Sequence, residues 1–310
     1  MKKIDTYLYS GFLDSGKTTY IQDNLFHDYF YKYGTTLILS FEEGEVSYDE
    51  EALRKRRCFV SYYRDSENIA AFCMSELERI RPDRVIIEDN VMIDGLVESL
   101  PEELCIRAKT ALFNGETLAL YFYNLRNQFT RILKDAVLVL FNRVENREDL
   151  LSFSTPFRLI SPKASYLWES PMGYHEKAFG IPLTYDRSKD VLIIGEEDYA
   201  CFYLDSLEQP EEYDGKTIEL TVQVQPSPLP EVPYVFAGRK VFTCCFADIQ
   251  TLGFFLAEES TSDFCLYGWY HLRAEAFSKT LAYQKRLCLR VKQADSCPPP
   301  EQELIGYTAA

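Results

Sequence analysis

The sequence predicts a mixed α/β fold, in which a parallel sheet flanked by helices comes first and a small all-β domain follows. Up to about residue 195, short apolar runs alternate with stretches of helical periodicity, which is typical of a parallel sheet covered on both faces. From about residue 196, short alternating runs are separated by Asp-Gly, Pro-rich and acidic turns, as in β-barrels or sandwiches. We expect a first domain over residues 1–190, a β domain over 191–295 and a flexible tail over 296–310.

The elements of both domains follow from these patterns. The expected strands of the first domain are Ile4–Ser10, Thr36–Phe41, Arg84–Glu88, Thr110–Asn114, Ala136–Phe141 and Phe157–Ile160. Its expected helices are Lys17–Tyr33, Ser66–Arg81, Glu116–Leu133 and Arg147–Leu151. Residues 165–195 are punctuated by Pro and Gly and are expected to be a connection. The expected strands of the β domain are Thr217–Val224, Tyr234–Ala237, Val241–Phe246, Thr251–Leu256 and Trp269–Glu275.

Composition excludes several classes of protein. The chain is 46% hydrophobic and 26% charged, which is ordinary for a globular protein. Its formal net charge of −15 argues against nucleic acid as a partner, because a basic stripe is the expected footprint. No apolar run is long enough for a membrane span, and the start is not typical of a signal peptide. The nine cysteines lack a disulfide-framework spacing, so we expect thiols and a cytoplasmic location.

The segment Gly11–Thr19 is a candidate phosphate-binding loop, or P-loop. It has the spacing G-x4-G-K-[ST] and lies between an expected strand and an expected helix. The backbone N–H groups of such a loop and the helix N-terminus favour anions. Lys17 would contact the terminal phosphates, and the Thr18 hydroxyl would ligate Mg²⁺. The nucleotide-binding residues expected here are Gly11, Asp14, Ser15, Gly16, Lys17, Thr18 and Thr19.

Two acidic residues bear on the chemistry of this loop. The apolar strand Arg84–Glu88 ends in an acid, so Glu88 would bind Mg²⁺ through water or polarise the attacking water. The alternative is a plain acidic strand end. Asp14 would repel the γ-phosphate unless Mg²⁺, Lys17 or a role in positioning water compensates.

A candidate base-recognition loop, Asn142–Glu145, follows another apolar run. Its sequence Asn-Arg-Val-Glu is a variant of the Asn-Lys-x-Asp motif of GTPases, in which the carboxylate accepts hydrogen bonds from guanine. Arg143 can stack on a base at least as well as Lys, whereas Glu145 is one methylene longer than Asp. The alternative is an ordinary loop after a strand. Together with the P-loop, this segment favours a GTPase, in which Asn142 and Glu145 recognise guanine, over an ATP-using kinase-like enzyme.

Residues 4–165 resemble the CobW-like GTPases, relatives of the metal-insertion GTPases HypB and UreG. Their P-loop has the pattern G-F-L-x-x-G-K-T-T, and Phe41–Asp49 resembles their segment N-E-F-G-E-V-G-I-D. The resemblance implies that Glu42, Glu45 and Asp49 form a nucleotide-sensing switch, with Glu42 on the Mg²⁺ side and Glu45 in catalysis.

A later loop and two departures refine this resemblance. Ser161–Ala164 is similar to the family's N-P-x-A loop, which implies that Lys163 and Ala164 lie near the guanine. The family continues its acidic strand end as Glu-x-x-Gly, but the chain has Val91 in place of that Gly. The metal-chaperone members carry C-x-C-C, where this chain has only Cys58, which is more typical of a half-buried strand thiol than of a metal site.

Residues 182–292 resemble the C-terminal domain of YcgQ-type proteins, which accompany predicted permeases and are thought to bear on divalent-metal handling. The resemblance implies a barrel of the oligonucleotide/oligosaccharide-binding (OB) type. Cys244, Cys245 and Asp248 would converge on a metal such as Zn²⁺ only if the strand breaks after Thr243, because adjacent side chains of a strand point to opposite faces. The alternative is one core and one surface cysteine.

Together these features predict a Mg²⁺-dependent, GTP-binding protein in which Lys17, Glu88 and Glu45 carry catalysis. The resemblances imply a role in metal homeostasis, with a permease component or a metal-receiving protein as partner. A scaffold that binds nucleotide without hydrolysing it, and recruits a partner through its β domain, is the alternative function.

Overall fold

The chain divides into two compact units. The computed structural model describes residues 3–27, 34–64, 68–170, 173, 175–181, 183–232, 234–242, 249–257, 264–301 and 303–306. Unit 1 comprises residues 1–150 and 163–179, and unit 2 comprises residues 151–162 and 180–310. The expected metal ligands Cys244, Cys245 and Asp248 lie outside the described residues.

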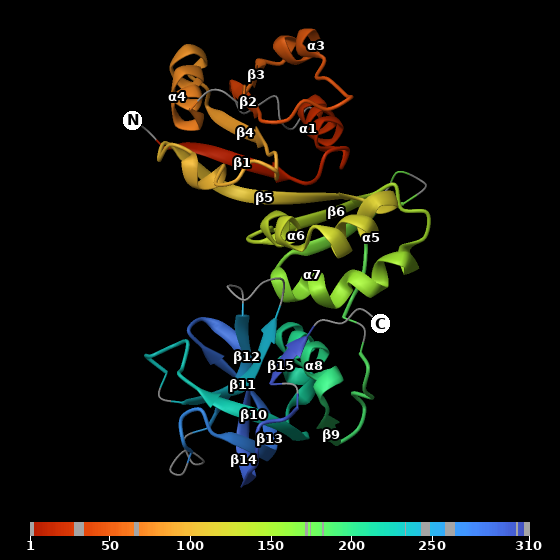
Figure 1. Cartoon of the computed structure of the whole chain (residues 1–310), viewed down its shortest axis with the longest axis vertical. Helices are drawn as coiled ribbons and strands as arrows, with labels where there is room; N and C mark the ends of the chain where they lie inside the picture. Colours follow the sequence, from red (N-terminus) through yellow and green to blue (C-terminus); the bar gives the residue numbers. More distant parts are fainter. Residues whose placement is uncertain are drawn as a thin grey trace. The chain divides into compact units, whose positions relative to one another are not determined.

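Unit 1 is built on a largely parallel sheet with the strand order β3-β2-β4-β1-β5-β6-β7-β8 (Figure 1). Every described pairing in it is parallel except that of β7 with β8. Its strands are β1 (Ile4–Ser10), β2 (Thr36–Ser40), β3 (Cys58–Tyr62), β4 (Arg84–Glu88), β5 (Leu104–Asn114), β6 (Leu138–Asn142), β7 (Ser165–Glu169) and β8 (His175–Lys177). This arrangement confirms the predicted α/β class.

Helices cover both faces of this sheet. Those of unit 1 are α1 (Lys17–Phe26), α3 (Glu50–Lys55), α4 (Ile69–Ile80), α5 (Gly115–Asn124) and α6 (Arg126–Leu133), with the 3₁₀ segment η1 (Val97–Ser99); a second 3₁₀ segment, η2 (Arg147–Phe153), spans the boundary with unit 2. Figure 1 shows α1 and α4 on opposite sides of β2 and β4. The packing agrees, because Leu37 and Leu39 lie in one cluster with residues of α4, and Ile38 lies in another with residues of α1. Burial on both faces explains why these central strands are continuous apolar runs.

Unit 2 contains a ring of five strands. Its elements are α7 (Ser154–Ile160), β9 (Val191–Ile194), α8 (Glu196–Glu208), η3 (Pro210–Tyr213), β10 (Thr217–Gln225), β11 (Val235–Phe242), β12 (Ile249–Leu256), β13 (Trp269–Leu281), β14 (Gln284–Ser296) and β15 (Leu304–Gly306). The ring runs β10-β11-β12-β14-β13 and closes by the pairing of β13 with β10. Strands β12 and β14 pair in parallel, and the other neighbours in the ring are antiparallel. Residues of α8 complete the ring's apolar core.

Several elements differ from those expected. The apolar run Phe157–Ile160 is the end of helix α7, in which Ser161 N donates to Phe157 O, and is not a strand. The expected helix Glu116–Leu133 is two helices, because Leu125 adopts non-helical dihedral angles between α5 and α6. The structure adds β7, β8 and β9 in the expected connection, and helix α8 after it. Within the expected flexible tail, Leu304–Gly306 pairs with β11.

Within the described residues, no helix is both long and apolar enough to cross a membrane.

Candidate nucleotide-binding site

The P-loop joins the end of β1 to the start of α1, and its path requires glycine at two positions. Gly16 has a φ of 85°, and a Cβ there would lie 2.7 Å from Asn142 Nδ2. A Cβ on Gly11 would lie 2.5 Å from Leu112 O. Asp14 also has a positive φ of 62°, which Asp tolerates better than most residues. The loop thus has the strand–loop–helix geometry that the motif predicts.

Lys17 is buried beneath this loop. Its Nζ donates to Gly11 O and Phe12 O, both at 2.9 Å, and lies 2.6 Å from Glu42 Oε2. Burial raises the pKa of Glu42, an effect that the Lys17 ammonium opposes only in part. Glu42 therefore pairs with Lys17, whereas the Thr18 hydroxyl donates to Glu88.

Three hydroxyl groups donate to the buried carboxylate of Glu88. Thr18 Oγ1 lies 2.6 Å from Oε1, while Ser40 Oγ and Tyr48 OH lie 2.7 and 3.0 Å from Oε2. The parallel register explains this arrangement, because Ser40 and Glu88 are paired end residues of β2 and β4. The Thr18 hydroxyl at the start of α1 and the Glu88 carboxylate at the end of β4 are hard oxygen donors, so these two residues fit a Mg²⁺ ion.

Asp89 is a buried acid that our sequence analysis did not include among the site residues. It directly follows β4, its N–H donates to Tyr9 O at 2.9 Å, and its carboxylate accepts a hydrogen bond from Ser10 Oγ. Its charge also raises the pKa of Glu42, after the larger effects of burial and Lys17. The sequence signal was the second acid in Glu88-Asp89. It follows β4 at the carboxyl-terminal end of the strands, where β1 leads into the P-loop.

The expected base-recognition loop contacts the P-loop directly. Asn142 Nδ2 donates to Ser15 O at 2.8 Å, and Arg143 Nη1 donates to Asp14 O at 3.0 Å. Parallel pairing of β5 with both β1 and β6 places Asn142 at the same sheet edge as the P-loop. Glu145 is exposed.

Lys163 and Ala164 lie elsewhere, which corrects the expectation that they approach the base. They follow helix α7 and precede β7, whose first residue, Ser165, pairs with Leu138, the first residue of β6. Because the strands are parallel, this loop lies at the amino-terminal ends of β6 and β7, whereas Asn142, which contacts the P-loop, ends β6 at its carboxyl terminus. The motif match assumed a strand before the loop, and a helix is there instead.

The remaining residues that the sequence singled out are exposed at the surface, cap a helix or are buried in the core. Asp14, Thr19 and Glu45 are exposed. The Asp49 carboxylate caps α3 by accepting a hydrogen bond from Ala52 N at 3.0 Å. Cys58 is a buried free thiol whose pKa is raised by burial. Within the described part of the chain, no group of three or more His, Cys, Asp or Glu residues is arranged to hold a metal ion.

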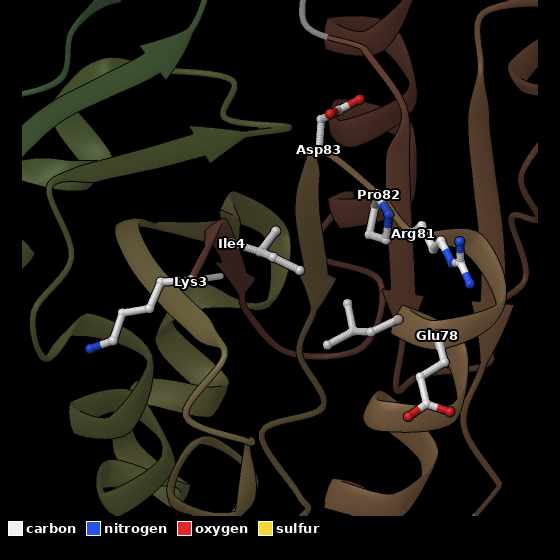
Figure 2. Close-up of a pocket in the computed structure, with 7 residues that line it drawn as sticks. Lys3, Ile4, Glu78, Arg81, Pro82 and Asp83 are labelled. Atoms are coloured by element: carbon white, nitrogen blue, oxygen red, sulfur yellow. The ribbon is translucent and has the colours of Figure 1, made fainter. Parts of the chain in front are cut away.

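A pocket of about 570 Å³ lies away from this site (Figure 2). Figure 2 shows Arg81, Pro82 and Asp83 between α4 and β4, with Lys3 and Ile4 at the start of β1. This is the amino-terminal edge of both strands, whereas Glu88 and the P-loop lie at the carboxyl-terminal edge. The pocket is therefore separate from the candidate nucleotide site.

Comparison with known proteins adds one family. Residues 174–305 match the DUF1980 C-terminal domain. The match covers the region where the sequence predicts a separate C-terminal β domain.

Solved structures give two further similarities. Hydrogenase maturation factor HypB from Archaeoglobus fulgidus is similar over 54% of this chain and 81% of its own, with 13% identity and a TM-score of 0.37. Signal recognition particle receptor FtsY from Elizabethkingia anophelis is similar over 46% of this chain and 51% of its own, with 13% identity and a TM-score of 0.32. Curated protein sequences give no match.

Proposed function

We propose that the chain is a Mg²⁺-dependent GTP-binding protein that hydrolyses GTP. The observation that carries this proposal is the pair of hydrogen bonds from Asn142 and Arg143 to the P-loop carbonyls of Ser15 and Asp14. They fix the base-recognition loop against the phosphate loop. A nucleotide whose phosphates lie in the P-loop then has its base within reach of Arg143 and Glu145.

Each residue has a role that its chemistry supports. Backbone N–H groups at the start of α1 and the Lys17 ammonium bind the phosphates. Thr18 and Glu88 hold Mg²⁺, which neutralises charge that develops on the phosphates. Arg143 stacks on the base, and Glu145 accepts its two hydrogen bonds.

A titration of fluorescent GTP and ATP analogues with Mg²⁺ tests the base specificity. We expect the wild-type chain to prefer GTP and Glu145→Ala to lose that preference while it still binds both nucleotides, because the phosphate contacts remain. Equal binding of the two nucleotides by the wild-type chain would contradict the assignment of Asn142–Glu145 to guanine.

The contact of Glu42 with Lys17 favours a second candidate, a scaffold that binds nucleotide without hydrolysing it. A carboxylate 2.6 Å from Lys17 Nζ competes with the terminal phosphate for the same ammonium. In addition, Val91 replaces the Gly that follows the acidic strand end in CobW-like GTPases. Phosphate release under saturating GTP and Mg²⁺ separates the candidates, because only the GTPase turns over repeatedly.

The biological role that we propose is metal homeostasis through a partner, a permease component or a metal-receiving protein. The CobW-like motifs of residues 4–165 and the YcgQ-type motifs of residues 182–292 support this role, and the strand order of the ring supports an OB-type barrel. Zn²⁺ binding measured by calorimetry on the wild-type chain and on Cys244→Ser/Cys245→Ser tests the metal. Equal Zn²⁺ binding by both proteins would exclude these two thiols as ligands.

A further inference from the structure

The carboxylate of Glu88 has two sides with different partners. Oε1 accepts the hydrogen bond from Thr18, the residue that would ligate Mg²⁺. Oε2 accepts the hydrogen bonds from Ser40 and Tyr48. The side of the carboxylate away from Thr18 is thus held by two groups that have no part in the P-loop motif.

Tyr48 belongs to the Phe41–Asp49 segment and is itself firmly placed. The side chain is only 6% exposed and packs in the cluster that contains Ile21 and Leu25 of α1. The next residue, Asp49, donates its N–H to Gln22 Oε1 at 2.7 Å and caps α3 with its carboxylate. Contacts with α1 and α3 therefore fix where the Tyr48 hydroxyl lies.

We propose that Tyr48 is a positioning residue for Glu88, and this inference rests on the proposed function. Its hydroxyl holds Oε2, so that Oε1 remains beside Thr18 and the carboxylate presents one fixed face to Mg²⁺. It also connects the segment that carries Glu42 and Glu45 to the cation-binding acid.

The strength of the hydrogen bond from Tyr48 to Glu88 determines how large an effect its loss should have. A hydrogen bond to a buried carboxylate is stronger than one between neutral groups, and replacing a group that orients a metal ligand lowers metal affinity or activity by about 10- to 100-fold.

Tyr48→Phe in the full-length chain tests the inference, because it keeps the buried ring and removes only the hydroxyl. The measurement is GTP affinity as a function of Mg²⁺ concentration, together with GTP affinity in EDTA. We expect the Mg²⁺ concentration for half-maximal effect to rise about 10- to 100-fold. GTP affinity without Mg²⁺ should stay within about twofold, since the P-loop is untouched.

Tyr9→Phe is the matched control. Tyr9 packs in the same cluster but donates no hydrogen bond to Glu88 among the described residues. We expect its Mg²⁺ dependence to equal that of the wild-type chain. The double variant Tyr48→Phe/Glu88→Gln should have the same half-maximal Mg²⁺ concentration as Glu88→Gln alone, because both changes act on one contact.

The outcomes separate the two proposals. If the wild-type chain binds GTP with Mg²⁺ and Tyr48→Phe has the same Mg²⁺ dependence, the positioning role is wrong while the proposed function stands. Equal losses in EDTA and in Mg²⁺ would also overturn it, because they would indicate a general structural effect. A wild-type chain that binds no GTP would overturn the proposed function and this inference with it.

Discussion

Lys17 is the side chain on which the proposed nucleotide binding depends most directly. Its ammonium is buried and positioned by two carbonyl oxygens of the loop that would surround the phosphates. We expect Lys17→Ala to weaken GTP binding by at least about 10- to 100-fold, the equivalent of one charge-assisted hydrogen bond. Equilibrium titration measures this, with the thermal midpoint of unfolding as the control for folding. Unchanged affinity in a folded variant would refute the P-loop assignment.

Glu42 is the side chain whose removal should strengthen binding. Its carboxylate pairs with Lys17, so a terminal phosphate that binds there as proposed would have to displace it. We expect Glu42→Gln to raise GTP affinity in EDTA by about tenfold, because a neutral amide competes less for the ammonium.

The neighbouring exposed Glu43 provides the control for this second change, and Glu43→Gln should leave affinity unaltered. Burial raises the pKa of Glu42, although Lys17 opposes the effect. The carboxyl is therefore protonated, and its ion pair lost, at a higher pH than for an ordinary glutamate. The affinity gap between wild type and Glu42→Gln should shrink as the pH falls towards that pKa, and a gap that widens instead would exclude the competition.

For the helices and strands, local sequence patterns were sufficient to predict some elements and their bounds, but not others. Strands β1 and β4 have the bounds that the sequence predicts, because β1 is an alternating segment followed by Gly11 and β4 is an apolar run bounded by charged residues. The run Phe157–Ile160 misled the prediction because a short apolar run fits a strand and a buried helix equally well. Helix α7 is such a case, with Phe157 and Leu159 both buried.

In the candidate site, local sequence patterns predicted individual residues but not the contacts between residues far apart in the chain. The P-loop spacing predicted Lys17 and Thr18, and the apolar runs before Glu88 and Asn142 predicted those two residues. The structure places all four at the carboxyl-terminal ends of their strands or in the P-loop that they contact. The sequence could not predict the contact of Tyr48 with Glu88 or that of Arg143 with Asp14. Each pairs residues far apart in the chain and depends on the turns between them.

The loop before β7 gives a prediction about element placement. Because Lys163 precedes the amino-terminal end of β7, and Asn142 lies at the carboxyl-terminal end of β6, we expect Lys163→Ala to leave GTP affinity and GTP-over-ATP preference unchanged. Arg143→Ala is the comparison, since Arg143 contacts the P-loop, and it should weaken binding. A loss of guanine preference in Lys163→Ala would indicate that this loop contacts the base, and would contradict its placement.

For the chain as a whole, the net negative charge opposes the binding of an anionic ligand such as the proposed nucleotide. A net charge of −15 repels a nucleotide at long range, so affinity has to come from donors that lie within a few ångströms. The P-loop amides and Lys17 are such donors, and they belong to unit 1. If GTP binds as proposed, the free energy of binding should stabilise unit 1, by about 2.7 kcal/mol when free GTP is 100 times Kd.

Hydrogen–deuterium exchange of the full chain, with and without GTP and Mg²⁺, measures where that stabilisation occurs. We expect slower exchange in the peptides that contain residues 11–19, 42–49 and 142–145, because ligand binding opposes the local openings through which amides exchange. Peptides from β10 to β14 should exchange at the same rate in both conditions, since their amides are held by the ring of strands in unit 2. Equal protection of both units would show that nucleotide binding is coupled to the β unit, and the site would then have to be described as a property of the whole chain.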